Sequence, residues 1–141
     1  MIHLARSGSG PVKADEIGQA MDVPTGFLRQ ILQSLDRAGF LTSTPGPNGG
    51  YALVVDPARV TVRQVIEALE GSITGGECAL RGGPCRWDDV CALHWAWSSA
   101  REAFASALDQ ATIAAVAAQD AALESGKQDI PTDTHRGGGS S

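Results

Sequence analysis

The stretch TGFLRQILQSLDRAGFLTSTPGPNGGYALVV, residues 25–55, joins an amphipathic helix pattern to a hairpin pattern. Gly39 lies where a C-cap glycine is expected, at the end of the helix pattern. Two short runs rich in β-formers, FLTST and YALVV, then flank PGPNGG, whose prolines and glycines suit a hairpin loop. The stretch therefore predicts a helix followed by a β-hairpin. The apolar stripe of the helix consists of Phe27, Leu28, Ile31, Leu32 and Leu35.

Another helix is expected just upstream of this stretch. VKADEIGQAM, residues 12–21, has apolar residues on one face, and Pro24 suits the first turn of the next helix. Two helices and then a hairpin follow the order of a winged helix-turn-helix domain, although an ordinary helical hairpin also fits the two helices. After the hairpin, VTVRQVIEALEG begins with Thr61 and Gln64, a capping-box pair. We therefore predict a mainly α-helical fold with a small β-hairpin wing, in a domain spanning residues 1–73.

A winged helix-turn-helix domain suggests a way of binding double-stranded DNA. The second helix would enter the major groove, and the wing would lie along the backbone or the minor groove. Base contacts are then expected from the start of the second helix, and phosphate contacts from the first strand. The glycine-rich loop would let the backbone approach DNA closely. The candidates are Thr25, Gly26, Arg29 and Gln30 for bases, Ser43 and Thr44 for phosphates, and Asn48, Gly49 and Gly50 for close approach.

All three cysteines of the chain lie within ECALRGGPCRWDDVCALHWAW, residues 77–97, with the spacing C-x6-C-x5-C. Their odd number excludes a closed set of internal disulfides. The glycines and proline between the first two thiols predict a loop over residues 74–90 that can fold back on itself. A histidine follows the last cysteine by three residues, about one helical turn away. The candidate metal ligands are Cys78, Cys85, Cys91 and His94.

Several chemistries fit these ligands. Thiolates from a loop and an imidazole from a helix can hold an iron–sulfur cluster, which the spacing favours. Zinc is the main rival, but zinc sites usually pair ligands two to four residues apart. Redox-active or buried thiols are the third possibility, and His94 could be an ordinary packed residue beside Trp95 and Trp97.

A long helix with a stripe of large and alanine residues is expected over residues 91–124. A helix of this length exceeds what so small a domain needs for its own core. We therefore expect it to pair with a second copy and form a homodimer, the alternative being packing against its own chain. Residues 125–141 are nearly devoid of apolar side chains and are expected to form a disordered tail.

Composition limits the functional class. The net charge is −5, but residues 1–70 carry six Lys/Arg against seven Asp/Glu, which leaves room for a local basic surface. No apolar stretch approaches the ~20 residues of a membrane span, and the start of the chain lacks a signal-peptide core. We therefore expect a cytoplasmic protein without a membrane partner. An enzyme is not expected, because no nucleotide-binding loop or nucleophile–base motif is present.

The runs FLRQILQSLDRAGFLTSTPGPNGGYAL and VTVRQVIEALEG, followed by three cysteines, resemble bacterial winged-helix regulators of the IscR/NsrR type. This type includes the iron–sulfur assembly repressor and the nitric-oxide-sensing repressor. The resemblance covers residues 1 to about 118. It implies a homodimer with crossing long helices, in which a [2Fe–2S] or [4Fe–4S] cluster on each subunit alters affinity for promoter DNA. By position, the three cysteines match the cluster cysteines, and His94 matches the histidine ligand of the assembly-repressor branch.

The function expected from this resemblance is a DNA-binding transcriptional regulator. Its cluster would sense redox, nitric oxide or iron–sulfur status. One alternative is a winged-helix regulator with zinc-bound or directly redox-reactive cysteines and no cluster. A remote alternative is a small iron–sulfur redox protein.

The sequence departs from the family pattern in three places. Relatives usually begin roughly a dozen residues earlier, and in the nitric-oxide branch an acidic cluster ligand lies near the partner chain's start. The chain as given therefore favours His94 or a non-protein ligand, and a misassigned start codon is a hypothesis that intact mass would test. The loop between the first two cysteines is one residue longer than in well-known relatives. Pro45 stands where the wing usually has arginine, and Arg29 where the assembly repressor has glutamate, so a different operator is expected.

Overall fold

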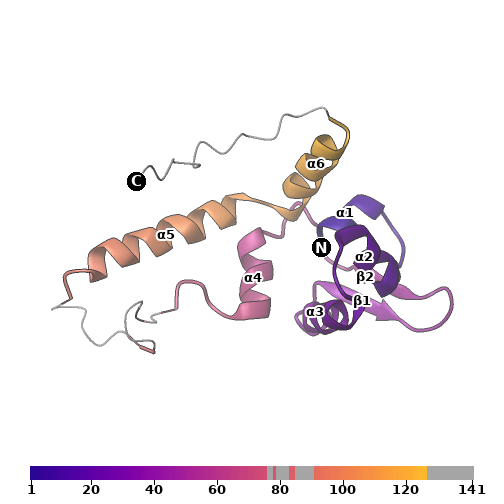
Figure 1. Cartoon of the computed structure of the whole chain (residues 1–141), viewed down its shortest axis with the longest axis horizontal. Helices are drawn as coiled ribbons and strands as arrows, with labels where there is room; N and C mark the ends of the chain where they lie inside the picture. The colour runs from indigo at the N-terminus through magenta and orange to yellow at the C-terminus, as the bar shows by residue number, and fades with distance from the viewer. Residues whose placement is uncertain (76–77, 79–82, 85–90, 127–141) are drawn as a thin grey trace, which may run out of the picture.

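The computed structural model describes residues 1–75, 78, 83–84 and 91–126 (Figure 1). The first part of the chain consists of three helices followed by an antiparallel β-hairpin. This order is the one predicted for a winged helix-turn-helix fold. The elements are α1 (Ile2–Ser7), α2 (Ala14–Met21), α3 (Thr25–Arg37), β1 (Leu41–Thr44), β2 (Gly50–Leu53), α4 (Val62–Glu70), α5 (His94–Gln110) and α6 (Ile113–Glu124).

The core of the winged helix forms between α1, α2, α3 and the start of β1. Leu28, Leu32 and Leu35 lie on one face of α3 and are buried, as their spacing predicts. Phe27, which the sequence pattern placed in the same apolar stripe, is 60% exposed. It precedes Leu28 by one residue, and one residue turns a helix by about 100°, so Phe27 lies at the edge of the buried face. The buried cluster consists of Leu4, Val12, Ile17, Leu28, Leu32, Leu35 and Leu41.

The wing is a two-stranded sheet whose register runs from Leu41 opposite Leu53 to Thr44 opposite Gly50. The chain before α2 joins it, because Val12 and Tyr51 exchange backbone hydrogen bonds of 2.9 and 2.8 Å. A side chain at Gly49 would place its Cβ 1.9 Å from the carbonyl oxygen of Thr44. The wing loop can therefore close only with glycine at this position.

Helix α4 begins with the predicted capping box. The Thr61 hydroxyl accepts a hydrogen bond from the Gln64 amide, and the Gln64 side chain accepts one from the Thr61 amide. Val65 and Leu69 of α4 are partly buried against the core of the winged helix. Helix α4 therefore connects the winged helix with the C-terminal helices, since it contacts both α3 and α5.

The single long helix expected over residues 91–124 is two helices, α5 and α6. Ala111 is extended, and the Thr112 hydroxyl accepts a hydrogen bond from the Ala115 amide as the N-cap of α6. The backbone at the break is also paired with Val60, which lies before α4, and with Val62, the first residue of α4. The Ala111 carbonyl accepts from the Val62 amide at 2.8 Å, and the Ile113 amide donates to the Val60 carbonyl at 2.9 Å. These long-range hydrogen bonds end the helix where the apolar periodicity alone would continue it.

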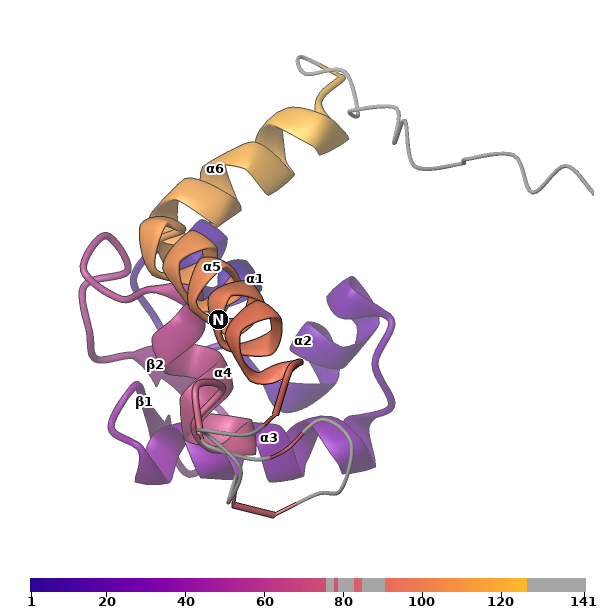
Figure 2. The same cartoon turned by 90° about the vertical axis from the view of Figure 1, so that its left-hand side faces the viewer.

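Helix α6 returns to the winged helix and packs against α1, while α5 extends away beside α4 (Figures 1 and 2). Arg6 of α1 forms ion pairs with Asp120 and Glu124 of α6, the first at 2.6 Å. The hydrogen bond from Arg6 holds the pKa of Glu124 below its ordinary value of 4.5. Residues 127–141, most of the expected disordered tail, lie outside the described residues.

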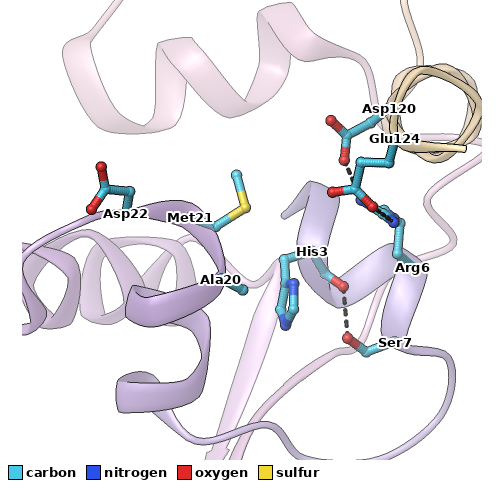
Figure 3. A pocket seen from close by; sticks show the side chains of 8 residues that line it. All are labelled: His3, Arg6, Ser7, Ala20, Met21, Asp22, Asp120 and Glu124. Carbon is cyan, nitrogen blue, oxygen red and sulfur yellow. Dashed lines mark hydrogen bonds and ion pairs between the residues drawn. The ribbon is translucent and has the colours of Figure 1, made fainter. Parts of the chain in front are cut away.

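A pocket of about 690 Å³ lies beside this α1–α6 contact and the end of α2 (Figure 3). Its lining includes His3 and Arg6 from α1, Met21 from α2 and the two α6 carboxylates. The Nε2 atom of His3 is buried and has no hydrogen-bond partner in the part of the chain that the structure describes. Among the described helices, none has the length and apolar character to cross a lipid bilayer.

Candidate functional site

The start of α3 presents the predicted base-contacting residues on the outside of the winged helix. Gly26, Arg29 and Gln30 are exposed, and Thr25 is partly buried. Arg29 approaches Asp15 of α2 with 3.7 Å between Nη2 and Oδ1, and the two side chains are 60% and 69% exposed. An ion pair this open contributes little, so the guanidinium can leave Asp15 for another acceptor.

Two further residues extend this polar face beyond the predicted set. Gln33 and Arg37 are exposed on α3, at seven and eleven residues after Gly26. The Arg37 Nε donates to the Gln33 carbonyl at 3.3 Å, which holds its side chain along the helix. Sequence reasoning missed them because it considered only the start of the helix. The i, i+4, i+7, i+11 spacing from Gly26 is the signal that would have found them.

The wing carries its candidates in different surroundings. Thr44 and Asn48 are exposed. The Ser43 hydroxyl donates to the Asp36 carboxylate at 2.8 Å, so it lies beside a negative charge. That charge disfavours a phosphate near Ser43. Gly49 is buried and its missing side chain makes room for the wing's own backbone, so its glycine requirement arises from the fold.

Gly50 has the same kind of internal role. Its φ is +152°, and a Cβ there would lie 2.5 Å from the carbonyl oxygen of Val12. The glycine therefore permits the close pairing of β2 with the chain before α2. The structure thus explains both glycines without DNA, and a close approach of either one to DNA stays a prediction.

Residues 74–91 are called the cysteine segment, and among its described residues Cys78 and Cys91 carry free, partly buried thiols. The Cys78 amide donates to the Gly83 carbonyl at 2.7 Å, so these two residues lie side by side. Cys85 lies outside the described residues. Among the described residues, no three metal-binding side chains meet at one point. The complete set of four expected ligands therefore stays a prediction.

His94 begins α5, and its amide donates to the Cys91 carbonyl at 3.0 Å. Its partly buried ring approaches the Ser98 hydroxyl, with 3.5 Å between Nε2 and Oγ, and meets Trp95 edge to face. Cys91 and His94 thus belong to one turn of chain at the base of α5. Thiolate sulfur and imidazole nitrogen are both ligand types for an iron–sulfur cluster and for zinc, so the donor chemistry of these two residues fits either group.

The fold and the exposed face of α3 define the class of protein. A winged helix-turn-helix with polar side chains along the recognition helix, here α3, is a DNA-binding fold of transcriptional regulators. Comparison with known proteins narrows this class. The family model Rrf2, described as an iron-dependent transcriptional regulator, matches residues 1–119. The chain belongs to this Rrf2 family of transcriptional regulators.

Named relatives and solved structures support the same assignment. The transcriptional regulator IscR of Cronobacter sakazakii is 31% identical over 114 residues, which cover 80% of this chain and 70% of that protein. CymR of B. subtilis, described as its global cysteine regulator, has a TM-score of 0.69 at 30% identity, covering 84% of this chain and 87% of CymR. IscR of T. potens also gives a TM-score of 0.69, at 25% identity, covering 92% of this chain and 83% of IscR.

Proposed function

We propose that this regulator is a cytoplasmic homodimer whose affinity for promoter DNA is controlled by an iron–sulfur cluster. The cluster would be held by Cys78, Cys85, Cys91 and His94. The position of the cysteine segment carries this proposal. It joins the winged helix to α5, and a backbone hydrogen bond links Cys91, just before α5, to His94, the first residue of α5. The similarity to proteins named IscR supports it.

The DNA interface of this proposal is the exposed face of α3. Arg29 would hydrogen-bond guanine or phosphate, and Gln30 would reach adenine or a neighbouring base. Phe27 lies next to these residues on α3 and is 60% exposed, and in this proposal it would contact a thymine methyl group. Thr44 and Asn48 of the wing would contact the phosphate backbone of the DNA.

The dimer of this proposal uses the open side of α5. Leu93, Trp97 and Phe104 recur at spacings of four and seven, and they are 41%, 42% and 56% exposed. Such a row of large apolar side chains on one helix suits pairing with the same helix of a second copy. Two winged helices joined in this way would meet two half-sites on DNA.

The bound cluster would supply reversible redox chemistry and reactivity toward small oxidants. The residues of the chain would then determine its effect on DNA binding. A folded loop from Cys78 to Cys91 would hold the base of α5 at a set distance from α4, and α4 packs against α3. Loss of the cluster would free that loop and alter how the two DNA-binding heads are ordered or spaced.

A second candidate is a regulator of the same fold whose cysteines bind zinc or react directly with oxidants. One support is that Cys78 and Cys91 are free thiols that are only partly buried. The other is the similar fold of CymR, described as the global cysteine regulator of B. subtilis. Partly exposed thiols can be oxidised without a metal. The cluster proposal and this candidate make opposite predictions for the purified protein.

The deciding experiment is anaerobic purification followed by iron, sulfide and zinc analysis and an absorbance spectrum. The proposal predicts a brown protein with iron and sulfide, and loss of both in C78A and C91A. S99A is the matched control, because Ser99 is an exposed residue of α5 outside the ligand set. A colourless protein with stoichiometric zinc would support the second candidate, and a metal-free protein with reactive thiols would support its redox form.

A further inference from the structure

Arg63 contacts residues of three parts of the chain: the DNA-binding domain, the C-terminal helices and the start of the cysteine segment. It belongs to α4, and each of its guanidinium nitrogens donates to a different partner. Nε donates to Glu67 Oε1 at 3.2 Å, Nη1 to Asp109 Oδ2 at 2.8 Å, and Nη2 to Thr74 Oγ1 at 3.4 Å. These acceptors lie on α4, on the last turn of α5, and in the turn that leads to Cys78.

The turn that leads to Cys78 is held at three points. Besides Arg63 on Thr74, the Ile73 amide donates to Glu67 Oε1 at 3.1 Å, the same oxygen that Arg63 uses. The Arg101 guanidinium of α5 donates to the Gly75 carbonyl, and it also lies over the Trp97 ring at 5.7 Å. Any displacement of residues 73–75 therefore breaks contacts with α4 and α5 together.

Asp109, the acceptor of Arg63 on α5, also contacts the start of α4. Asp109 accepts from Arg63 and, at 3.5 Å, from the Thr61 hydroxyl at the N-cap of α4. The backbone hydrogen bonds from Val62 to Ala111 and from Ile113 to Val60 lie next to these contacts in the chain. The link from Arg63 to Asp109 is thus continuous with the junction between α5 and α6, and α4 itself packs against α3.

From this geometry we infer that Arg63 is a positioning residue that transmits the state of the cysteine segment to α4 and α5, and so sets how strongly that state changes DNA affinity. The inference rests on the proposed function. A planar guanidinium with a separate partner on each nitrogen suits this role, whereas a lysine ammonium cannot reproduce the fixed fork. The hydrogen bonds that Arg63 donates to Asp109 and Glu67 raise its pKa, so the guanidinium stays charged.

The test compares R63Q with R59Q in the full chain. Arg59 lies just before α4, is exposed, and loses the same charge, so R59Q controls for electrostatics. The probe is the duplex that the wild-type protein selects from a random pool. Affinity for it is measured for cluster-free protein and for protein reconstituted anaerobically with iron and sulfide. The measured quantity is the ratio of the two dissociation constants.

We expect R63Q to bring this ratio at least about fivefold closer to one, while R59Q leaves it within about twofold of wild type. Iron content should stay unchanged in R63Q. In the absence of any cluster, hydrogen exchange at residues 73–75 should quicken in R63Q and stay unchanged in R59Q, because the Thr74 and Glu67 contacts are lost. D109N should lower the ratio in the same way, and R63Q/D109N should add little to either single change, since both remove one link.

An unchanged ratio in R63Q and D109N would overturn the inference, and so would loss of iron in R63Q, which would make Arg63 part of the cluster site. Should R63Q fail to fold, D109N decides alone. Equal affinity of both wild-type forms would instead refute the proposed function. A wild-type difference that survives R63Q would refute only the role of Arg63.

Discussion

Arg29 is the residue on which sequence-specific DNA binding depends most in this account. Its side chain is 60% exposed, and its link to Asp15 is weak. We predict that R29A lowers affinity for the selected duplex by about 1–3 kcal/mol and relaxes preference at a single base pair. A binding assay over duplexes mutated at each position measures this. R59A serves as the control, and an equal loss in both variants would show that Arg29 contributes charge alone.

Leu32 and Phe27 belong to one predicted stripe, yet they should differ sharply in their effect on stability. Leu32 is 2% exposed and contacts the core cluster, whereas Phe27 is 60% exposed. L32A should lower the free energy of unfolding by about 2–5 kcal/mol. F27A should cost less than ~1 kcal/mol, because little apolar surface is returned to water. Urea unfolding followed by circular dichroism measures both, and similar losses would mean that Phe27 is covered in the folded protein.

Some residue roles could be predicted from the sequence, and others could not. Thr61 and Gln64 form a local capping box, so a few residues of sequence suffice to predict it. Gly49 and Gly50 were assigned to DNA contact, but their glycine requirement comes from Thr44 and Val12. Val12 is distant in sequence, and its approach depends on tertiary packing. Which four ligands meet stays a prediction, because Cys85 lies outside the described residues.

At the scale of elements, the contact of α6 with α1 should weaken in acid. The hydrogen bond from Arg6 lowers the pKa of Glu124 below 4.5, so the folded state favours the ionised carboxylate. This contact therefore adds stability above pH 4.5 and loses it as the pH falls through the lowered pKa. E124Q should melt at a lower temperature than wild type at pH 7, and the gap should narrow as the pH falls through the lowered pKa of Glu124.

A matched control for this prediction is E102Q, because Glu102 is an exposed carboxylate on α5. Thermal melts followed by circular dichroism at several pH values would compare the three proteins. A gap between wild type and E124Q that stays constant down to about pH 3 would contradict the role assigned to the ionised Glu124.

The elements were predictable to the extent that their patterns are local. The periodicity of α3 and the turn residues of the wing predicted both elements within a few residues of their observed bounds. The division between α5 and α6 was missed because the apolar spacing runs through it. Two backbone hydrogen bonds with residues 60 and 62 produce the break. These partners lie some fifty residues away in the sequence, so a local pattern cannot predict them.

At the scale of the whole molecule, α5 should hold two copies together. Phe104 is 56% exposed within the row that includes Leu93 and Trp97. A buried charge in a paired helix is costly, so F104E should convert the dimer to a monomer at micromolar concentration. Sedimentation velocity measures this. S106E places the same charge on the opposite side of α5 and should stay dimeric, and dimers in both variants would show that α5 is not the pairing surface.

Control of DNA binding by a cluster in the cysteine segment can be tested in a single comparison. The dissociation constant for the selected duplex is measured anaerobically for the cluster-loaded protein and for the same preparation after the cluster is removed. If the cluster controls DNA binding, the two dissociation constants should differ by about fivefold or more. Equal affinity of the two forms for that duplex would contradict it.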